Sequence, residues 1–138
     1  MEERRHIQHM STLARAKYRL YQRAPYWSHL LSTLALIEHD KVPEELAAKG
    51  PEYALSYGAA TPTAIHVFEE NAKDLDDDQY VAFLAHELMH HVTDFFGRVG
   101  GKDRHMFNLA QDFVINQTLL ASGFKPFPGM SLPQQYGA

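Results

Sequence analysis

The sequence of 138 residues contains no cysteine. Disulfide bonds and thiolate metal ligands are therefore excluded, so a metal site in this chain would have to use histidine nitrogens and carboxylate oxygens. The same absence is compatible with a reducing compartment, and we expect the protein to be cytoplasmic.

Long hydrophobic runs are also absent. The longest apolar stretch, residues 30–37, contains Ser32 and Thr33 and is far shorter than the roughly 20 residues of a membrane span. Residues 1–9 carry charge, but no apolar run follows them, so they do not resemble a secretory signal peptide. We therefore expect a soluble protein with no membrane partner.

The chain has no excess of basic residues. Its 13 Lys and Arg are outnumbered by 17 Asp and Glu, which gives a net charge of -4. This charge does not support a nucleic-acid-binding surface, and we expect no nucleic-acid partner. A hydrophobic content of 45% in 138 residues is enough for one core and too little for two, which predicts a single domain over residues 1–138.

What the sequence does contain is the pentapeptide His86-Glu87-Leu88-Met89-His90, within a segment of helical periodicity. Histidines four positions apart on a helix are separated by about 40° and 6 Å, so both imidazoles can bind one zinc ion. Glu87 is rotated by about 100° from His86 and lies beside such an ion rather than on it. There its carboxylate can act as a general base that activates water for attack on a carbonyl group.

The periodicity around the pentapeptide favours a functional interpretation. On a helical wheel, apolar residues such as Leu84 and Leu88 occupy one side, whereas both histidines and Glu87 lie on a polar stripe. The alternative is that His86 and His90 are ordinary surface or hydrogen-bonded histidines. A single stripe that carries two ligands and a base argues against that alternative.

A catalytic zinc site needs a third protein ligand and an open fourth position, and three candidates follow the pentapeptide: Asp94, His105 and Asp112. Asp94 lies about 12 Å along the helix from His86, too far to join both histidines on one ion. We expect it to be a hydrogen-bond partner of His90 or a solvated carboxylate. His105 and Asp112 are about 10.5 Å apart along one helix, so only one of them can bind that ion.

Asp112 is the favoured third ligand. It lies in a helical segment, residues 105–120, that is apolar on most of its circumference. Burying a carboxylate there is costly unless its charge is compensated, and a metal cation does so. A helix-capping or amide-bonded aspartate is the alternative. His105 then becomes our candidate for stabilising the oxyanion, a role for which Arg104, His91 and a tyrosine are also open.

These two segments resemble a metallopeptidase domain that commonly precedes a von Willebrand factor A-like domain in bacterial and phage proteins. In that family the second motif reads Trp-Asn-x-Ala-x-Asp-x-x-Ile-Asn, and its Asp is the expected third zinc ligand. The matching residues here are Asn108, Ala110, Asp112, Ile115 and Asn116, with Phe107 in place of the Trp. The resemblance continues upstream through residues 23–31 and downstream to Gly123 and Pro128, so it covers roughly residues 14–137.

The chain departs from the family pattern at two places. It has Asp94-Phe95 where members often have Gly-His, and Thr61-Pro62-Thr63 where they often have a Thr-Asp-Gly turn. Neither departure touches the proposed ligands. The resemblance implies a zinc-dependent peptidase that acts on a protein or peptide substrate. The sequence contains no von Willebrand-like domain, so we expect that a separate partner protein could take its place.

Two other functions remain open. The interval from His90 to His105 is similar to that of SprT-like proteases, which use a third histidine, although the glycine that usually follows this histidine is replaced by Met106. The chain could also be a non-catalytic binding module in which zinc joins two helices. A general base such as Glu87 favours an enzyme, because a structural site is closed by a fourth protein ligand and needs no base.

The fold predicted from the sequence is α+β, a minimal zincin-like domain that is mostly helical with a small β-hairpin or sheet beside the metal-binding helix. Acidic residues 74–78 suit the N-terminus of that helix, which we expect to end near Gly97. The other predicted helices are residues 11–23, 25–38, 44–49 and 105–120. Residues 53–57 and 64–68 are predicted to form the hairpin, with the second strand as the edge that receives substrate. Proline-rich residues 124–133 are expected to form an extended strap over the core or the cleft.

Overall fold

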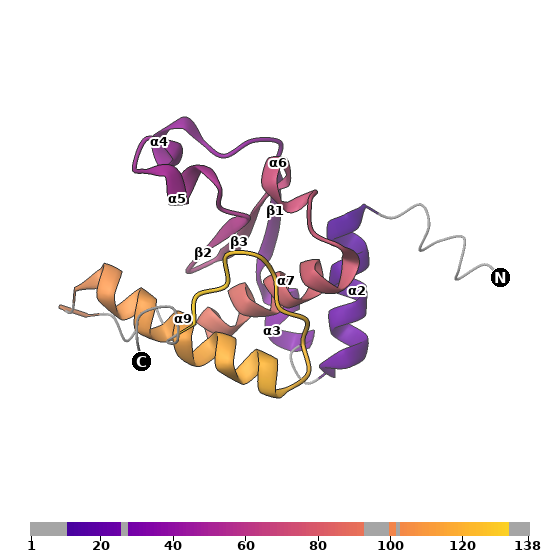
Figure 1. The fold of residues 1–138 in the computed structure, drawn as a ribbon. Helices are drawn as coiled ribbons and strands as arrows, with labels where there is room; N and C mark the ends of the chain where they lie inside the picture. Colours follow the sequence, from indigo (N-terminus) through magenta and orange to yellow (C-terminus); the bar gives the residue numbers. More distant parts are fainter. Residues whose placement is uncertain (1–10, 26–27, 93–99, 102, 133–138) are drawn as a thin grey trace.

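The fold is α+β, in agreement with the prediction, and the computed structural model describes residues 11–25, 28–92, 100–101 and 103–132. Helices cover a small sheet in the part of the chain described (Figure 1). The longer helices are α2 (Thr12–Arg23), α7 (Asp77–Val92) and α9 (Arg104–Ala121). The shorter ones are α3 (Ser28–Thr33), α4 (Glu44–Ala47), α5 (Pro51–Ala54) and α6 (Glu69–Ala72). None of the described helices has the length and apolar character needed to cross a membrane.

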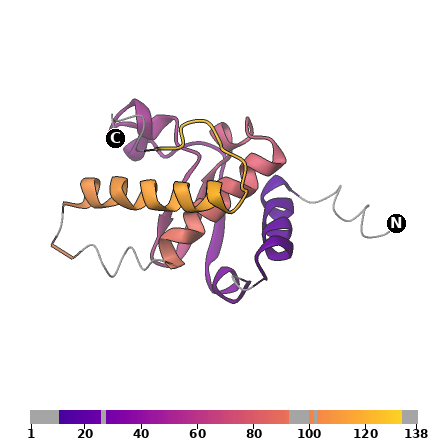
Figure 2. The same ribbon diagram turned by 60° about the horizontal axis from the view of Figure 1, so that its bottom comes forward.

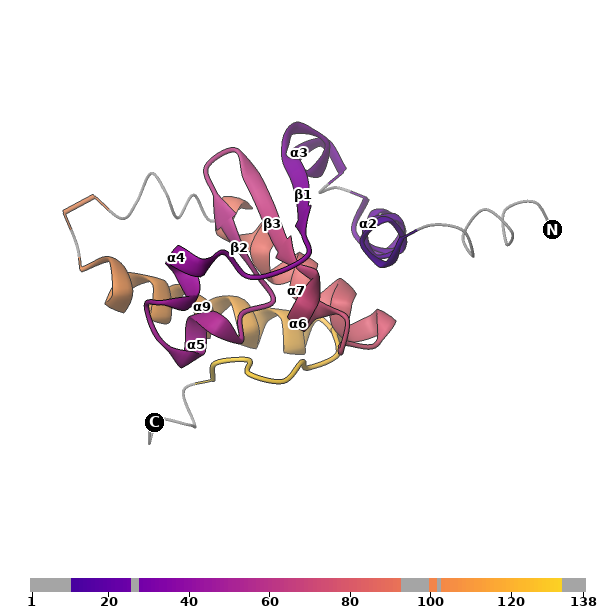
Figure 3. The ribbon, with the colours of Figure 1, turned by 90° about the horizontal axis from the view of Figure 1, so that it is seen from above.

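The sheet has three strands in the order β1-β3-β2. β3 (Ala64–Phe68) is central, with β1 (Ala35–His39) parallel on one side and β2 (Gly58–Thr61) antiparallel on the other. α7 lies beneath this sheet when the molecule is seen from above (Figure 3). Because β3 is flanked on both sides, the prediction that it is the substrate-receiving edge is wrong. β2 is the edge strand of the hairpin.

The predicted hairpin exists, but its first strand begins later than expected. Residues 53–57 do not form a strand, because Pro51 starts α5 and the chain enters β2 only at Gly58. The side-chain amide of Asn71 donates hydrogen bonds to the backbone oxygens of Ala54 and Ser56, at 2.9 and 2.8 Å. These two carbonyl groups therefore have hydrogen-bond partners outside the sheet. A strand over residues 53–57 is not needed to satisfy them.

The predicted helix over residues 25–38 is wrong in its second half, which forms β1. The hydroxyls of Ser32 and Thr33 donate to the backbone oxygens of His29 and Leu30, both at 2.7 Å, at the end of α3. The apolar residues that follow then pair with β3, a strand about 30 positions later in the sequence. Local periodicity carries no information about such a partner, and tertiary pairing overrides the helical pattern.

The helix with the two histidines begins where the sequence predicts. Asp76 accepts a hydrogen bond from the backbone N–H of Gln79 at 2.8 Å, and the Gln79 side chain accepts one from the Asp76 N–H at 3.0 Å. This reciprocal pair is a capping box, which satisfies two backbone donors at the start of α7. The predicted end near Gly97 lies outside the described residues.

α7 is the central helix of the core. α2 and α9 both pack against it, and Figure 2 shows α9 lying across α7. Leu84 and Leu88 are fully buried, as are Leu20 of α2 and Ile115 of α9. Within this apolar surrounding, Glu87 and His90 are among the few buried polar side chains of the described residues. The polar side chains of α7 are therefore surrounded by a packed apolar core.

Residues 124–132, which we call the strap, turn back over the molecule after α9. Gly123 has a φ of 86°, the amide of Gly123 donates to the Leu120 oxygen, and the amide of Phe124 donates to the Leu119 oxygen. This is a Schellman motif, which ends the helix and favours glycine at the position with positive φ. The strap then passes across the molecule in front of α7 (yellow in Figure 1), as predicted from its prolines.

Candidate metal centre

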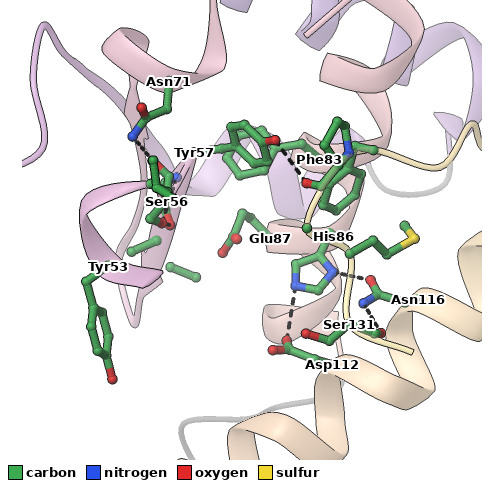
Figure 4. Close-up of a pocket in the computed structure, with 18 of the residues that line it drawn as sticks. Tyr53, Ser56, Tyr57, Asn71, Phe83, His86, Glu87, Asp112, Asn116 and Ser131 are labelled. Atoms are coloured by element: carbon green, nitrogen blue, oxygen red, sulfur yellow. Dashed lines mark hydrogen bonds and ion pairs between the residues drawn. The ribbon is translucent and has the colours of Figure 1, made fainter. Parts of the chain in front are cut away.

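Three side chains converge between α7 and α9, and Figure 4 shows two of them, His86 and Asp112. The Nε2 atom of His86 lies 3.1 Å from Oδ1 of Asp112, and Nε2 of His90 lies 3.2 Å from the same oxygen. Only 12%, 7% and 19% of the side-chain surfaces of His86, His90 and Asp112 are exposed. The structure therefore brings the three predicted ligands together at one largely buried position.

Packing explains why these residues meet. His86 and His90 are one helical turn apart on α7, and their ring centroids are 5.0 Å apart. On α9, Ile115 and Leu119 are buried in the core, which fixes the rotation of the helix about its axis. Asp112 lies one turn before Ile115 and therefore faces α7. The apolar contacts of Ile115 and Leu119 fix the rotation of α9, and this rotation brings Asp112 to the two histidines of α7.

The three atoms form a donor set suited to a divalent cation. One potential ligand atom from each side chain lies within 4.8 Å of the other two. Two imidazole nitrogens and a carboxylate oxygen all present lone pairs, so their close approach requires either protons or a cation between them. Two histidines and a carboxylate are a ligand set found in catalytic zinc sites.

Charges at this point shift the pKa values of the ligands. Burial raises the pKa of Asp112, but His86 and His90 beside its Oδ1 together lower it by more, and the result is a pKa of about 2. Burial lowers the pKa of His86, but the carboxylates of Asp112 and Glu87 together raise it above its ordinary value. Asp112 is thus held as an anion, the form in which a carboxylate binds metal.

Two amide side chains on α9 hold the ligands in place. Asn116 bridges two groups: its Oδ1 lies 2.6 Å from Nδ1 of His86, and its amide nitrogen donates to the Ser131 backbone oxygen at 2.7 Å. Asn108 donates to Oδ2 of Asp112 at 3.4 Å. Hydrogen bonds behind metal ligands fix their orientation. Each amide is four positions from Asp112, one before it and one after it, and both belong to the motif on which the family resemblance rests.

Glu87 lies next to the ligands, and its carboxylate points into a cavity (Figure 4). The residue is only 8% exposed. Burial raises its pKa, the neighbouring His86 and His90 lower it, and Asp112 raises it again, with a net increase. A carboxylate whose pKa is raised toward neutrality is better able to accept and return a proton than a solvated one.

The cavity has a volume of about 880 Å³. Its helical wall comes from α7 and α9, and an irregular wall comes from the segment around α5 and β2 together with the strap. The helical wall includes Phe83, His86, Glu87, His90, Asn108, Leu109, Asp112 and Asn116. The irregular wall includes Tyr53, Leu55, Ser56, Tyr57, Gly58, Ala59, Ala60, Asn71, Phe127, Pro128, Gly129, Met130 and Ser131.

The strap was expected over the core or the cleft, but sequence reasoning missed the other residues of the irregular wall and the contacts that hold it. The hydroxyl of Tyr57 donates to the Pro128 backbone oxygen at 2.9 Å and so ties the strap to the segment before β2. A Cβ atom on Gly58 would lie 2.2 Å from the His66 oxygen and 2.7 Å from the Phe83 ring, so only glycine allows β2 to approach α7 this closely. No local pattern marks these contacts, because they join segments that are distant in the sequence.

The remaining candidates are placed less completely. The backbone of Arg104 and His105 forms the first turn of α9, but their side chains lie outside the described residues, as does all of Asp94. His91 is half-buried, and burial lowers its pKa while a hydrogen bond with the Ala64 backbone raises it. His91 is therefore directed to β3 and does not line the cavity.

Comparison with known proteins agrees with the resemblance seen in the two motifs. A family model described as "Putative metallopeptidase domain" matches residues 8–135. No curated protein and no solved structure matches the chain. The matched range includes both helices of the candidate metal centre and the strap.

Proposed function

The chain belongs to this metallopeptidase family, and we propose that it is a zinc-dependent peptidase. His86, His90 and Asp112 would hold the ion, and Glu87 would be the general base. The observation that carries the proposal is the convergence of both Nε2 atoms on Asp112 Oδ1, at 3.1 and 3.2 Å, beside a buried carboxylate that faces a cavity.

Zinc is favoured by the type of donor. Imidazole nitrogens suit zinc and the late transition metals, whereas calcium and magnesium prefer a set of oxygens. When bound, the ion would supply Lewis acidity, which lowers the pKa of water and polarises a carbonyl group. Only three metal-binding side chains converge among the described residues. That number supports an enzyme, because a structural zinc site is normally closed by a fourth protein ligand.

Glu87 would move the proton. In the proposed reaction its carboxylate accepts a proton from the attacking water and returns it to the amine that leaves when the peptide C–N bond breaks. Burial is the main cause of its raised pKa, which suits it for both transfers. Phe83 and Phe127 line the cavity around the carboxylate and reduce its contact with bulk water.

We propose that β2, rather than β3, binds the backbone of the substrate. Its residues Gly58, Ala59 and Ala60 line the cavity, and among the described residues the strand is paired on one side, by β3. The free edge can accept an extended peptide by strand addition. A peptide on this edge would pass between the irregular wall and the helix that carries Glu87.

The donor that stabilises the oxyanion remains a proposal. His105 is still our sequence-based candidate, on the first turn of α9. Tyr57 is a second candidate from the described residues, because its hydroxyl lies at the cavity wall, although its one O–H would have to turn from the Pro128 oxygen to the oxyanion. A His105→Gln variant and a Tyr57→Phe variant would separate the two, since loss of an oxyanion donor lowers kcat about 100- to 1,000-fold.

The test of the mechanism is Glu87→Gln. We expect unchanged zinc content and at least a 100-fold loss in cleavage of a fluorescence-quenched peptide library, because a general base contributes about 10² to 10⁴ in rate. Glu45→Gln, on the exposed surface of α4, is the matched control and should cleave normally. Full cleavage by Glu87→Gln would exclude it as the base, and no cleavage by the zinc-loaded wild type would count against a peptidase.

The third ligand is tested by Asp112→Ala. We expect the zinc content of the purified protein to fall to background by elemental analysis, because two histidines alone do not make a closed or catalytic zinc site. His105→Gln should retain one zinc per chain. The reverse result would assign the third ligand to His105 and favour the SprT-like alternative.

A further inference from the structure

A chain of hydrogen bonds connects the candidate metal centre to the strap. His86 Nδ1 lies 2.6 Å from Asn116 Oδ1, and Asn116 Nδ2 donates to the Ser131 backbone oxygen at 2.7 Å (Figure 4). Asn116 is 1% exposed, so water does not compete for either bond. The metal centre and the strap therefore share one buried amide.

The direction of each bond in this chain follows from the groups present. The Ser131 carbonyl oxygen can only accept, so the NH₂ end of the Asn116 amide must face it. The amide oxygen then faces His86, and His86 must donate through Nδ1–H. Nε2 is then the ring nitrogen that faces Asp112 and would bind the metal. A reversed amide would place two acceptors together at Ser131.

The strap forms part of the cavity. Phe127, Pro128 and Met130 line it, and the ring centroid of Phe127 lies 6.0 Å from that of His86. Met130 is buried, and its amide donates to the Phe127 oxygen at 3.2 Å. Any change in how the strap is held would therefore change the shape of the space beside Glu87.

We propose that Asn116 is a positioning residue that couples metal occupancy of His86 to the seating of the strap. Metal on Nε2 would hold the imidazole ring of His86 in one place, which holds the Asn116 amide against Nδ1 and its NH₂ group against the Ser131 oxygen. Without metal, the ring is restrained by weaker contacts alone, so the amide and the strap that it holds are restrained less firmly. Coupling of this kind is reciprocal, so the seated strap in turn strengthens metal binding. The inference rests on the proposed metal site but does not require turnover.

Two variants of Asn116 separate the effect of its hydrogen bond with His86 from that of its hydrogen bond with Ser131. Asn116→Ala removes both hydrogen bonds, and we expect zinc affinity, measured by competition with a chromophoric chelator, to fall about 10- to 100-fold. Asn116→Asp keeps an acceptor for His86 Nδ1–H but places an oxygen against the Ser131 oxygen. It should lose the strap contact and, by reciprocity, about five- to tenfold in zinc affinity, and it serves as the test if the alanine variant does not fold.

The strap is followed by hydrogen exchange of a peptide covering residues 124–132, in the full chain with and without Zn²⁺. In wild type, zinc should slow this exchange roughly five- to tenfold, the factor that corresponds to one hydrogen bond of ordinary strength. In both Asn116 variants, zinc should leave the exchange of this peptide unchanged.

Asn71→Ala is the matched control. Asn71 also uses its amide to hold a cavity-wall segment, by donating to the Ala54 and Ser56 oxygens, but it has no contact with the metal ligands. It should leave both zinc affinity and the zinc effect on the strap unchanged. Zinc-dependent slowing in the Asn116 variants equal to that of wild type would overturn the coupling alone. A wild type that binds no zinc would overturn the coupling together with the proposed function.

Discussion

The two walls of the cavity are held by different means. The helical wall is fixed by core packing, with Leu84, Leu88 and Ile115 fully buried beneath it. In the irregular wall only β2 is part of the sheet, and hydrogen bonds from the side chains of Tyr57, Asn71 and Asn116 to backbone oxygens hold the segments on either side of it. The candidate catalytic groups are on the helical wall. Side chains that support chemistry need a rigid setting, whereas a surface that receives different peptides benefits from an adjustable one.

The largest effect on stability is expected from removing packing beneath the helical wall. Leu88→Ala should lower the free energy of unfolding by about 2 to 5 kcal/mol in chemical denaturation, because it leaves a cavity at a fully buried position. Leu55→Ala is the matched change on the irregular wall, where the leucine is 70% exposed, and should cost less than about 0.5 kcal/mol. Equal losses for the two variants would contradict the distinction between the walls.

The second change acts where the two walls meet. Gly58→Ala places a Cβ 2.2 Å from the His66 oxygen and 2.7 Å from the Phe83 ring, so β2 must move away from α7. We expect a loss of about 1 to 3 kcal/mol in the free energy of unfolding, as for other cases of overpacking. Gly101→Ala, with no atom within 4 Å of the added Cβ, is the control and should be near neutral. A stable Gly58→Ala protein would mean that the irregular wall tolerates displacement of β2.

The smallest change removes one hydroxyl from the irregular wall. Tyr57→Phe keeps the ring but loses the hydrogen bond to the Pro128 oxygen, which should cost about 1 kcal/mol or less in stability. Its main effect should be faster hydrogen exchange within residues 124–132. Tyr53→Phe, on the same wall, is the control, because the Tyr53 hydroxyl has no hydrogen bond to any other described residue. Unchanged exchange in Tyr57→Phe would show that packing, rather than this bond, holds the strap.

The same contrast explains what the sequence could predict. α7 and α9 follow from helical periodicity and capping residues such as Asp76 and Gln79, which are local signals. His86, His90 and Asp112 could be grouped because ligand spacing and the burial of a carboxylate are also visible in the sequence. The meeting of these three side chains in the structure agrees with that grouping.

The irregular wall could not be predicted because its contacts are distant in sequence. The apolar residues of β1 suited a helix equally well until β3 was available as a parallel partner. The start of β2 depends on Asn71, which satisfies carbonyls more than ten positions earlier. The bond from Tyr57 to Pro128 spans 71 positions. Only the proline content of the strap was a local signal, and it predicted an extended path without predicting what holds it.

In the part of the chain that the structure describes, the outer edge of β2 has no partner strand, and this has a consequence for self-association. An unpaired strand edge is a template for any extended chain, including a second copy of the same protein. β2 limits this hazard by its length of four residues and by its composition of Gly58, Ala59, Ala60 and Thr61, which includes only one residue of high β-propensity. Lengthening this strand or enriching it in valine and isoleucine would strengthen peptide binding and aggregation together.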